Sequence, residues 1–446
     1  MTQTINGYEL TDIAALLSTP EARNAIIARN LYIGDQLSET TKYLDGPYGI
    51  REWRERRYKP FCHNITQDII DKSGLLFSDG VPTITVTKKS GKIDTTKSND
   101  IFEYIEYDDL AETFAHIDRY NRLLKSSGLV FGFDAEENEL TMDVVHAGNS
   151  FVVMDNCCKP DMLIRAISGD RIEVTTKDKI YIIEISGHTY SIAGVSDNVF
   201  GIIPFAVFHD SSPPVYGGPY NRVDTGLIDF NLSLNKQFTE LNYSLEHIQR
   251  PTLFVSGASM PEGAIAGPGS IINLDSTVPG QAPTVEYKTP QVDVGAIQAI
   301  LDAQIKQAAS SYSVRIAEDS SVVTSGFSLI VKENANLELR KRRQRQFESG
   351  FKEAQEVIKT ILAYVGFDLG DASITIGFPA PSLPINEMEQ EQIWDMRISS
   401  GRATIKDYLM EVKKMTSEEA DKKLVELEAS KQVQAQTSQP TNIVGA

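Results

Sequence analysis

The sequence predicts a multidomain α+β protein from which two long helices project. Two amphipathic helix patterns, at residues 223–249 and 293–312, are separated by a short Gly/Pro-rich segment with strand-like stretches. Over residues 128–208, apolar residues instead alternate with a period of two, which predicts a small, largely antiparallel sheet. Two rods joined by a small β-containing tip suggest a spacer or a wall in an assembly, because a compact enzyme rarely needs that shape.

The first rod has apolar residues at steps of three and four, so that they share one helical face. These residues are Leu227, Phe230, Leu234, Phe238, Leu241, Leu245 and Ile248. At 1.5 Å rise per residue, the helix would be about 40 Å long. The dipeptide Arg250-Pro251 ends it, because proline disfavours helical geometry at the preceding residue and cannot continue the hydrogen-bond ladder.

The second rod follows Thr289-Pro290, with Asp293 as its expected N-cap. Its apolar residues are Ile297, Ile300, Leu301, Ile305 and Ala308. Between the rods, strand-like stretches at 252–256, 270–274 and 284–288 predict the β-containing tip.

The rest of the chain divides at polar and Pro/Gly-rich segments. Residues 1–80 are predicted to be mainly helical, 88–100 to be an exposed loop, and 108–126 to be a helix. A linker at 211–219 marks a domain boundary before the first rod. Beyond the second rod we expect a polar loop, the longest helix, a returning strand, a Pro-rich linker and a last helical segment with a disordered tail.

Composition and charge restrict the class of protein. Of 446 residues, 41% are hydrophobic and 23% charged, no apolar run is long enough to span a membrane, and no signal peptide is evident. Three cysteines give neither a disulfide framework nor a metal-ligand spacing, so we expect an intracellular protein. The net charge of −18 argues against a repressor, nuclease or polymerase, because proteins that grip phosphates are usually basic. It is compatible with a protein past which DNA slides.

The sequence contains no recognisable catalytic motif. It lacks a phosphate-binding loop, a His-Glu-x-x-His zinc motif, a Gly-x-Ser-x-Gly elbow and a Cys-x-x-Cys pair, and its six histidines are scattered. We therefore expect no enzyme activity, no cofactor and no metal. A glycosidase-type carboxylate pair stays open, since the separation that matters there is spatial.

One dense basic run lies inside the predicted longest helix. It comprises Arg340, Lys341, Arg342, Arg343 and Arg345. A helix spreads these charges around its axis, and we favour ion pairing with Glu333, Glu338 and Glu348 or with acidic residues of a neighbouring subunit. Direct contact with DNA phosphates is the alternative.

The order of these elements, together with two local sequences, resembles the portal proteins of tailed bacteriophages. Thr324-Ser325-Gly326-Phe327-Ser328-Leu329, followed by Leu337 and Leu339, is similar to the Ser-Gly-x-Ala/Ser-Leu start of the long helix in the group named for a Bacillus siphophage. Residues 64–77, continuing into Val81-Pro82, are similar to that group's passage from a helix into the wing. Ser328 stands where alanine is common, which exchanges one small residue for another.

The resemblance implies a portal fold with an α/β wing, a two-helix stem, a small β-containing clip, a long wing helix and an α-helical crown. The implied parts are an N-terminal wing at 1–220 with its sheet at about 128–208, stem helices at 221–249 and 293–314, a clip at 250–292, a tunnel loop at 315–325, the long wing helix and returning strand at 326–379, the crown at 380–431 and a disordered tail at 432–446.

The resemblance also implies a function and partners. Twelve copies would form a ring at one capsid vertex, as the channel for packaging and ejecting double-stranded DNA without sequence specificity. The ring would be a docking platform for the large terminase subunit and a head–tail adaptor, and would contact the major capsid and scaffolding proteins. The protein would be made in the host bacterial cytoplasm and reside in the virion, with no membrane partner.

Particular residues are expected to serve the channel and the ring. The loop facing DNA would present Glu318, Asp319, Ser320, Ser321, Val322, Val323 and Thr324. Subunit packing in the stem would use Leu227, Phe230, Leu234, Leu241, Leu245, Ile297, Leu301 and Ile305. The basic run would contact a neighbouring subunit or DNA.

Two other classes stay open. One is a different virion structural protein or an adaptor ring, which subunit stoichiometry would distinguish from a portal. The other is a hydrolase built on residues 129–208 with Asp and Glu as acid and base, which would show turnover that is lost on substitution of those residues.

Overall fold

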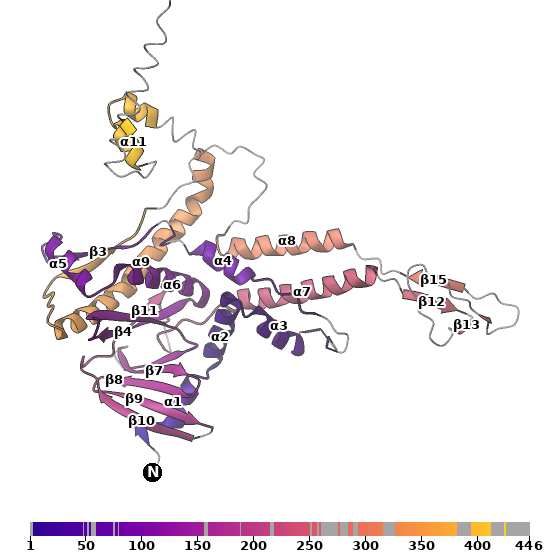
Figure 1. Cartoon of the computed structure of the whole chain (residues 1–446), viewed down its shortest axis with the longest axis horizontal. Coiled ribbons are helices and arrows are strands. Elements are labelled where there is room, and N and C mark those ends of the chain that lie inside the picture. Colours follow the sequence, from indigo (N-terminus) through magenta and orange to yellow (C-terminus); the bar gives the residue numbers. More distant parts are fainter. Residues whose placement is uncertain are drawn as a thin grey trace, which may run out of the picture. The chain divides into compact units, whose positions relative to one another are not determined.

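The computed structural model divides the chain into two compact units, residues 1–318 with 336–381 and residues 319–335 with 382–446 (Figure 1). The residues that the structure describes are 3–424 without 48, 51–52, 55–58, 75, 79, 156–158, 188, 215–217, 250–251, 257, 260–274, 277–283, 289–292, 315–325, 381–393 and 412–422. The two units are taken in turn below.

A three-stranded antiparallel sheet in the order β11-β4-β5 forms the centre of the first unit. The strands are β4 (Ser126–Asp134), β5 (Glu139–Val145) and β11 (Phe205–His209). Two helices pack on the sheet, α6 (Tyr107–Leu124) and α9 (Gly326–Tyr364). Leu129 and Phe131 of β4 join α6 and α9 in one core cluster, whereas Val130 faces a second cluster that includes strands of another sheet. This alternation follows from the two-residue period of a strand.

The second sheet is a five-stranded antiparallel meander in the order β10-β9-β8-β7-β6. Its strands are β6 (Ser150–Met154), β7 (Pro160–Ser168), β8 (Arg171–Thr176), β9 (Lys179–Ser186) and β10 (Thr189–Asp197). Helix α1 (Leu10–Leu16) packs on it through Ile13, next to the hairpin of β1 (Thr4–Ile5) and β2 (Tyr8–Glu9). The sequence therefore predicted antiparallel strands correctly, but the single sheet that it suggested is two sheets.

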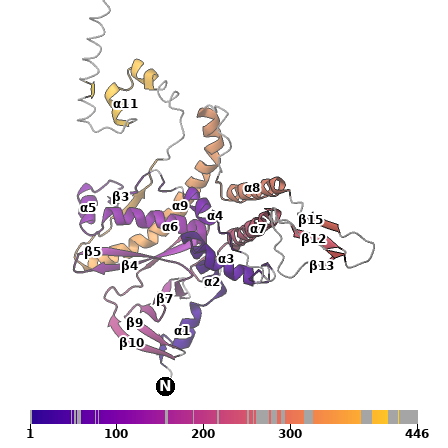
Figure 2. The same ribbon diagram turned by 45° about the vertical axis from the view of Figure 1, so that its right-hand side comes forward.

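A further core cluster takes Tyr120, Leu123 and Leu124 from α6, and five other helices gather around it (Figures 1 and 2). They are α2 (Pro20–Ile33), α3 (Gln36–Asp45), α4 (Ile65–Ser73), α7 (Thr225–Gln249) and α8 (Val294–Ser311). Side chains cap three of them: Thr19 accepts from Ala22 N, Asn64 from Gln67 N, and Asp293 from Ala296 N at 3.0 Å. The predicted rods are thus confirmed as helices, and so is the N-cap of the second.

Short strand pairs complete the first unit. They are β12 (Thr252–Ser256) with β15 (Thr284–Lys288), β13 (Ala258–Ser259) with β14 (Asp275–Ser276), and β3 (Thr83–Thr87) with β16 (Ser373–Gly377). The predicted tip strands at 252–256 and 284–288 are confirmed, and the one predicted at 270–274 lies outside the described residues. The predicted returning strand is β16.

One expectation about local structure needs correction. Residues 88–100 contain helix α5 (Thr95–Asp100), capped by Asp94, which is followed by a 3-10 turn (Ile101–Glu103) instead of a continuous loop. In the second unit, the described part of the predicted last helical segment contains helical residues at 394–399, turns at 400–404 and α11 (Ile405–Glu411). The expected tail at 432–446 lies outside the described residues.

Candidate functional site

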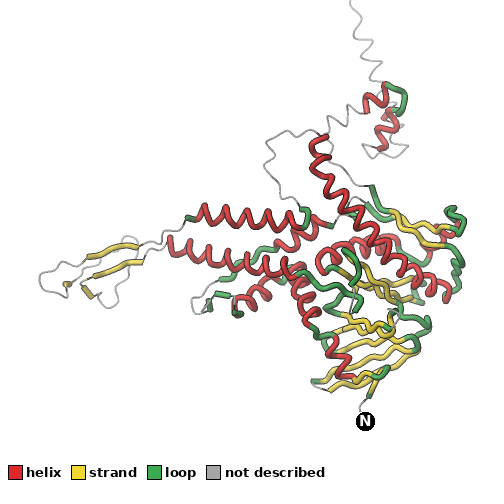
Figure 3. The backbone as a smooth tube through the Cα atoms, turned by 180° about the vertical axis from the view of Figure 1, so that it is seen from behind, coloured by secondary structure: helices red, strands yellow, loops and turns green. Residues whose placement is uncertain are grey.

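Helices α7 and α8 lie side by side and run in opposite directions, joined through the β12–β15 ribbon (Figure 3). The face of α7 that looks towards the body of the unit packs with α2 and α4 in one core cluster. From α7 the cluster takes Leu227, Ile228, Leu232 and Leu234, and from α8 it takes Leu301 and Ala309. The base of the helix pair is therefore held by apolar contacts within the subunit.

The residues predicted to pack between neighbouring stems occupy two kinds of position. Leu227, Leu234 and Leu301 are 5%, 0% and 1% exposed, so their contacts lie within one subunit and the prediction of intersubunit packing is corrected for them. The others are only partly buried: Phe230, Leu241, Leu245, Ile297 and Ile305. The physical reason is that α2 and α4 already cover the stripe near the base of α7.

Helix α8 keeps most of its surface open. Of its residues only Leu301 and Ala309 are buried, while Ile300 is 56% exposed. The exposed alanines Ala296, Ala299 and Ala303 lie one turn or less from Ile300 on the same side of the helix. A soluble helix normally presents charged or polar residues on such a face, so this face is a candidate contact surface.

A polar ladder lies between the apolar residues on the buried face of α7. Asn231, Asn235 and Thr239 are spaced by one helical turn and are at most 1% exposed. They accept hydrogen bonds from backbone N–H groups of the segment 61–66: from Thr66 at 3.1 Å, from His63 at 2.9 Å and from Phe61 at 2.9 Å, respectively.

The side chain of Gln36 on α3 completes the ladder. Its Oε1 accepts from Asn231 Nδ2 at 2.7 Å and from Asn235 Nδ2 at 3.1 Å. Sequence reasoning missed these contacts, since Asn and Thr at one-turn spacing look like a solvated face. The one available signal was that they repeat every fourth residue on a helix otherwise rich in leucine.

Because of the helical turn of α9, some residues of its basic run are buried and the others are exposed. Arg340 donates to the carbonyl oxygens of Leu76 and Pro379, and Arg343 donates to Asp118 Oδ1 and to Ser73 O. Both are at most 5% exposed. The structure therefore corrects the expected partners of Arg343, which are acids of the body of the unit rather than glutamates on neighbouring turns.

The remaining members of the basic run face outward. Lys341, Arg342 and Arg345 are exposed, and none of them forms an ion pair with another described residue. Since a helix turns 100° per residue, they lie on the side opposite Arg343 and Phe347. They keep the predicted role of contacting another molecule, whereas Arg340 and Arg343 have no surface left for it.

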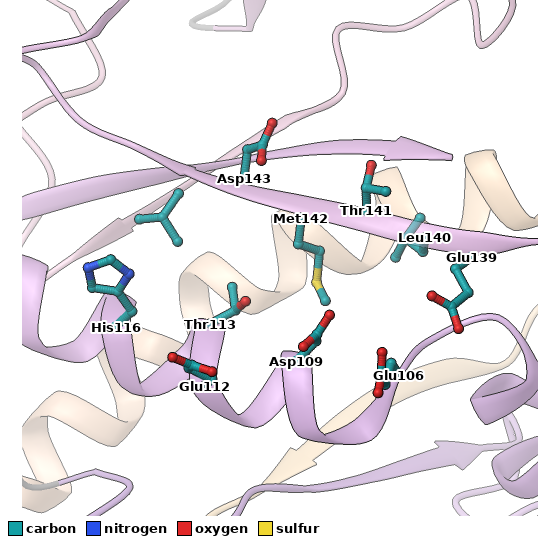
Figure 4. Close-up of a pocket in the computed structure, with 11 residues that line it drawn as sticks. Glu106, Asp109, Glu112, Thr113, His116, Glu139, Leu140, Thr141, Met142 and Asp143 are labelled. Atoms are coloured by element: carbon teal, nitrogen blue, oxygen red, sulfur yellow. The ribbon is translucent and has the colours of Figure 1, made fainter. Parts of the chain in front are cut away.

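An acidic groove of about 480 Å³ runs between α6 and β5 (Figure 4). Glu106, Asp109 and Glu112 line it from the side of α6, and Glu139 and Asp143 from β5. Asp143 is paired with Arg165 at 2.6 Å. Within the described ranges, no cluster of three or more His, Cys, Asp or Glu has a geometry suited to a metal ion.

Two further predictions concern the channel loop and the crossing of a membrane. The channel-loop residues 318–324 lie outside the described part of the chain, so their placement stays a prediction. In the part of the chain that is described, no helix combines the length and apolar character that crossing a bilayer requires.

Comparison with known proteins identifies the class. The family model described as "Phage portal protein, SPP1 Gp6-like" matches residues 62–435, which is most of the chain. The chain therefore belongs to this family of phage portal proteins. It is a structural component of a virion, as the resemblance implied, and the sequence prediction of a portal is confirmed. No curated protein matches the chain.

Among the solved structures that match the chain are chains from gene transfer agent particles. A chain from the virion of a native gene transfer agent (GTA) particle is 11% identical, with 81% of this chain and 93% of that chain covered, at a TM-score of 0.41. A chain from the neck of the native GTA particle computed with C12 symmetry is 10% identical, with 82% and 93% covered, at 0.40. Because these TM-scores are below 0.5, the assignment rests on the family match.

Proposed function

We propose that twelve copies of this chain form a ring at a unique capsid vertex and that double-stranded DNA enters and leaves through its centre. The observation that carries the ring is the open apolar face of α8 around Ile300. Cyclic symmetry repeats one contact between the same two surfaces and leaves no exposed end, so it covers such a face on every copy. Membership of the portal family supports this use of the surface.

The proposed ring divides the chain as the resemblance implies. Helices α7 and α8 form the stem, the β12–β15 ribbon belongs to the clip at 250–292, and the two sheets with α6 and α9 form the wing. Residues 315–325 are the tunnel loop, 380–431 the crown and 432–446 the tail. The family membership and the order of the described elements support this division.

The charge of the chain supports a passive channel. With a net charge of −18, the ring repels DNA on average, and a wall that does not bind phosphates adds no barrier to sliding. We assign Glu318, Asp319, Ser320, Ser321, Val322, Val323 and Thr324 to the channel surface. Shortening residues 315–325 should then impair DNA packaging, and a virion packaged to normal density with the shortened loop would contradict the assignment.

Other components act on this ring in our proposal. The large terminase subunit supplies the ATP-driven motor as a separate chain, since no phosphate-binding loop occurs in this sequence. A head–tail adaptor docks on the ring after packaging, and major capsid and scaffolding proteins surround it. Synthesis takes place in the cytoplasm of the host bacterium.

Mass measurement and negative-stain imaging of the purified chain test the ring. Twelve copies of a 49.4 kDa chain give about 0.6 MDa, seen end-on as a closed ring with a central hole. A smaller closed ring would favour an adaptor, and a monomer or dimer that stays unassembled with scaffolding and capsid proteins would overturn the portal function. In that case, turnover assays of the β region would test the hydrolase alternative.

A further inference from the structure

Four charged side chains are buried together where α6, α9 and the end of β11 meet. Asp118, Arg122, Asp210 and Arg343 are between 2% and 9% exposed, and we call them the junction cluster. Two of them are acidic and two basic, so these four charges are paired, as buried charges generally need to be. None of them has a part in the channel or in the ring contact described above.

Arg343 is the contribution of α9 to the cluster. Its Nη2 donates to Asp118 Oδ1 at 2.5 Å, and its Nη1 donates to the carbonyl oxygen of Ser73 at 2.6 Å. Its Nε lies 3.4 Å from Asp210 Oδ1. Arg343 thus binds α9 to α6, to the end of α4 and to the residue that follows β11.

Arg122 connects the same aspartate to the end of α8. Its Nη1 donates to Asp210 Oδ2 at 3.3 Å, and its Nη2 donates to the carbonyl oxygen of Tyr312 at 2.9 Å. Tyr312 is the C-cap residue of α8, and the guanidinium of Arg122 stacks 4.8 Å from the centre of its ring. The Tyr312 hydroxyl lies 3.5 Å from Asp224, directly before α7.

Asp210 is therefore shared between α8 and α9, which are consecutive helices of the chain. Through Arg122 it holds the end of α8, and through Arg343 it holds α9. Lys125 adds a third cation at 3.7 Å from Asp210 Oδ2. Burial lowers the pKa of Arg122 and of Lys125, and the charge of Asp210 opposes that shift.

Stability alone is a weak reason for such a cluster. Desolvating these charges is costly, and well-packed apolar residues often replace a buried ion pair without loss of stability. The cluster is also incompletely bonded: Arg122 Nε and Asp210 Oδ1 are buried without a hydrogen-bond partner in the described part of the chain. Arg122 Nε is a donor without an acceptor and Asp210 Oδ1 is held by the ion pair with Arg343 Nε at 3.4 Å, so the same side chains can form a second arrangement.

We propose that the junction cluster is a coupling joint in which Asp210 transmits a displacement of α8 to α9, and of α9 to α8. The inference rests on the proposed function, which identifies α8 as a stem helix and α9 as the helix that follows the channel loop. In the assembled ring, the joint would link the position of each stem to the wing of the same subunit.

Hydrogen exchange measured on the full-length chain, with Asp210→Asn compared to the natural protein, tests the joint. The substitution keeps the size of the side chain and removes the shared charge. We expect amide exchange to rise about tenfold, and together, in the last turn of α8 and in the part of α9 around Arg343. Exchange in the β7–β9 sheet should stay unchanged, because that sheet belongs to a different core cluster.

The control is Asp371→Asn, which removes an exposed carboxylate 3.1 Å from Lys89 and should leave both helices unchanged. A rise in only one of the two helices, or an equal rise across the whole chain, would overturn the joint. If Asp210→Asn does not fold, Arg122→Lys replaces it in the experiment. Lysine retains the positive charge but lacks the guanidinium that donates to both Asp210 and Tyr312. Ring formation is scored separately by mass, so a failed joint and a failed portal assignment give different results.

Discussion

Helices α7 and α8 carry similar apolar patterns and lie side by side, yet the base of α7 is buried within the subunit and most of α8 is open. The buried face of α7 packs against α2 and α4 through apolar residues and holds the segment 61–66 through the polar ladder. On α8 only Leu301 and Ala309 are buried, and Ile300 is 56% exposed.

The difference teaches that a periodic stripe specifies a buried face but not the chain that buries it. The stripe of α7 is covered by helices of its own subunit, so substitutions there should act on folding. The open face of α8 has no cover within the described subunit, so substitutions there should act on assembly. Three substitutions can break or sharpen this distinction through the free energy of unfolding of the subunit.

The largest effect is expected for Leu234→Ala on α7. Leu234 is fully buried, and removing its side chain leaves a cavity between α7 and the helices that pack on it. The free energy of unfolding should fall by about 2–5 kcal/mol. Urea unfolding of the dissociated subunit, followed by circular dichroism, measures it. A loss below about 1 kcal/mol would mean that the base of α7 is not part of the subunit core.

An intermediate effect is expected for Asn235→Ala in the polar ladder of α7. Asn235 Oδ1 accepts from His63 N at 2.9 Å, and its Nδ2 donates to Gln36 Oε1 and Thr40 Oγ1. Alanine removes these bonds and leaves Gln36 Oε1 with the bond from Asn231 alone, which should cost about 1–3 kcal/mol in the same unfolding assay.

The matched control for Asn235→Ala is Ser233→Ala, two residues away on the same helix. Ser233 is only half-buried, and its recorded side-chain contact is with Gln237 at 3.3 Å. The control should change the unfolding free energy by less than about 0.5 kcal/mol. Equal losses in the two variants would show that the ladder contributes nothing specific.

What the sequence could predict follows from which signals are local. The period of 3.6 located α7, α8 and α9 because each presents an apolar stripe over many turns. The period of two located the strands, but it contains no information about their partners, so the division into two sheets was missed. Residues 95–100 are polar and resemble a loop, and only the cap by Asp94 makes a helix of them.

The site was less predictable because its contacts join residues far apart in the chain. Arg343 looked like part of a surface basic run, and its burial depends on Asp118, which is 225 positions earlier. Asn231 and Asn235 were not identified from the sequence, because their partners lie in α3 and in the segment 61–66. The periodicity of one segment does not predict which distant residue a side chain contacts.

The smallest effect on the subunit, and the clearest on assembly, is expected for Ile300→Ser on α8. An exposed side chain contributes little to folding, so the unfolding free energy should change by less than about 0.5 kcal/mol. If a neighbouring copy covers Ile300, each contact loses about 1–2 kcal/mol of apolar burial. The concentration at which half of the chains are in rings should then rise at least about tenfold, as measured by mass photometry.

Lys306→Ala, a substitution of an exposed residue on the same helix, serves as the control for Ile300→Ser. Rings that tolerate Ile300→Ser as well as they tolerate Lys306→Ala would place the subunit contact elsewhere and leave the open face of α8 without its proposed role.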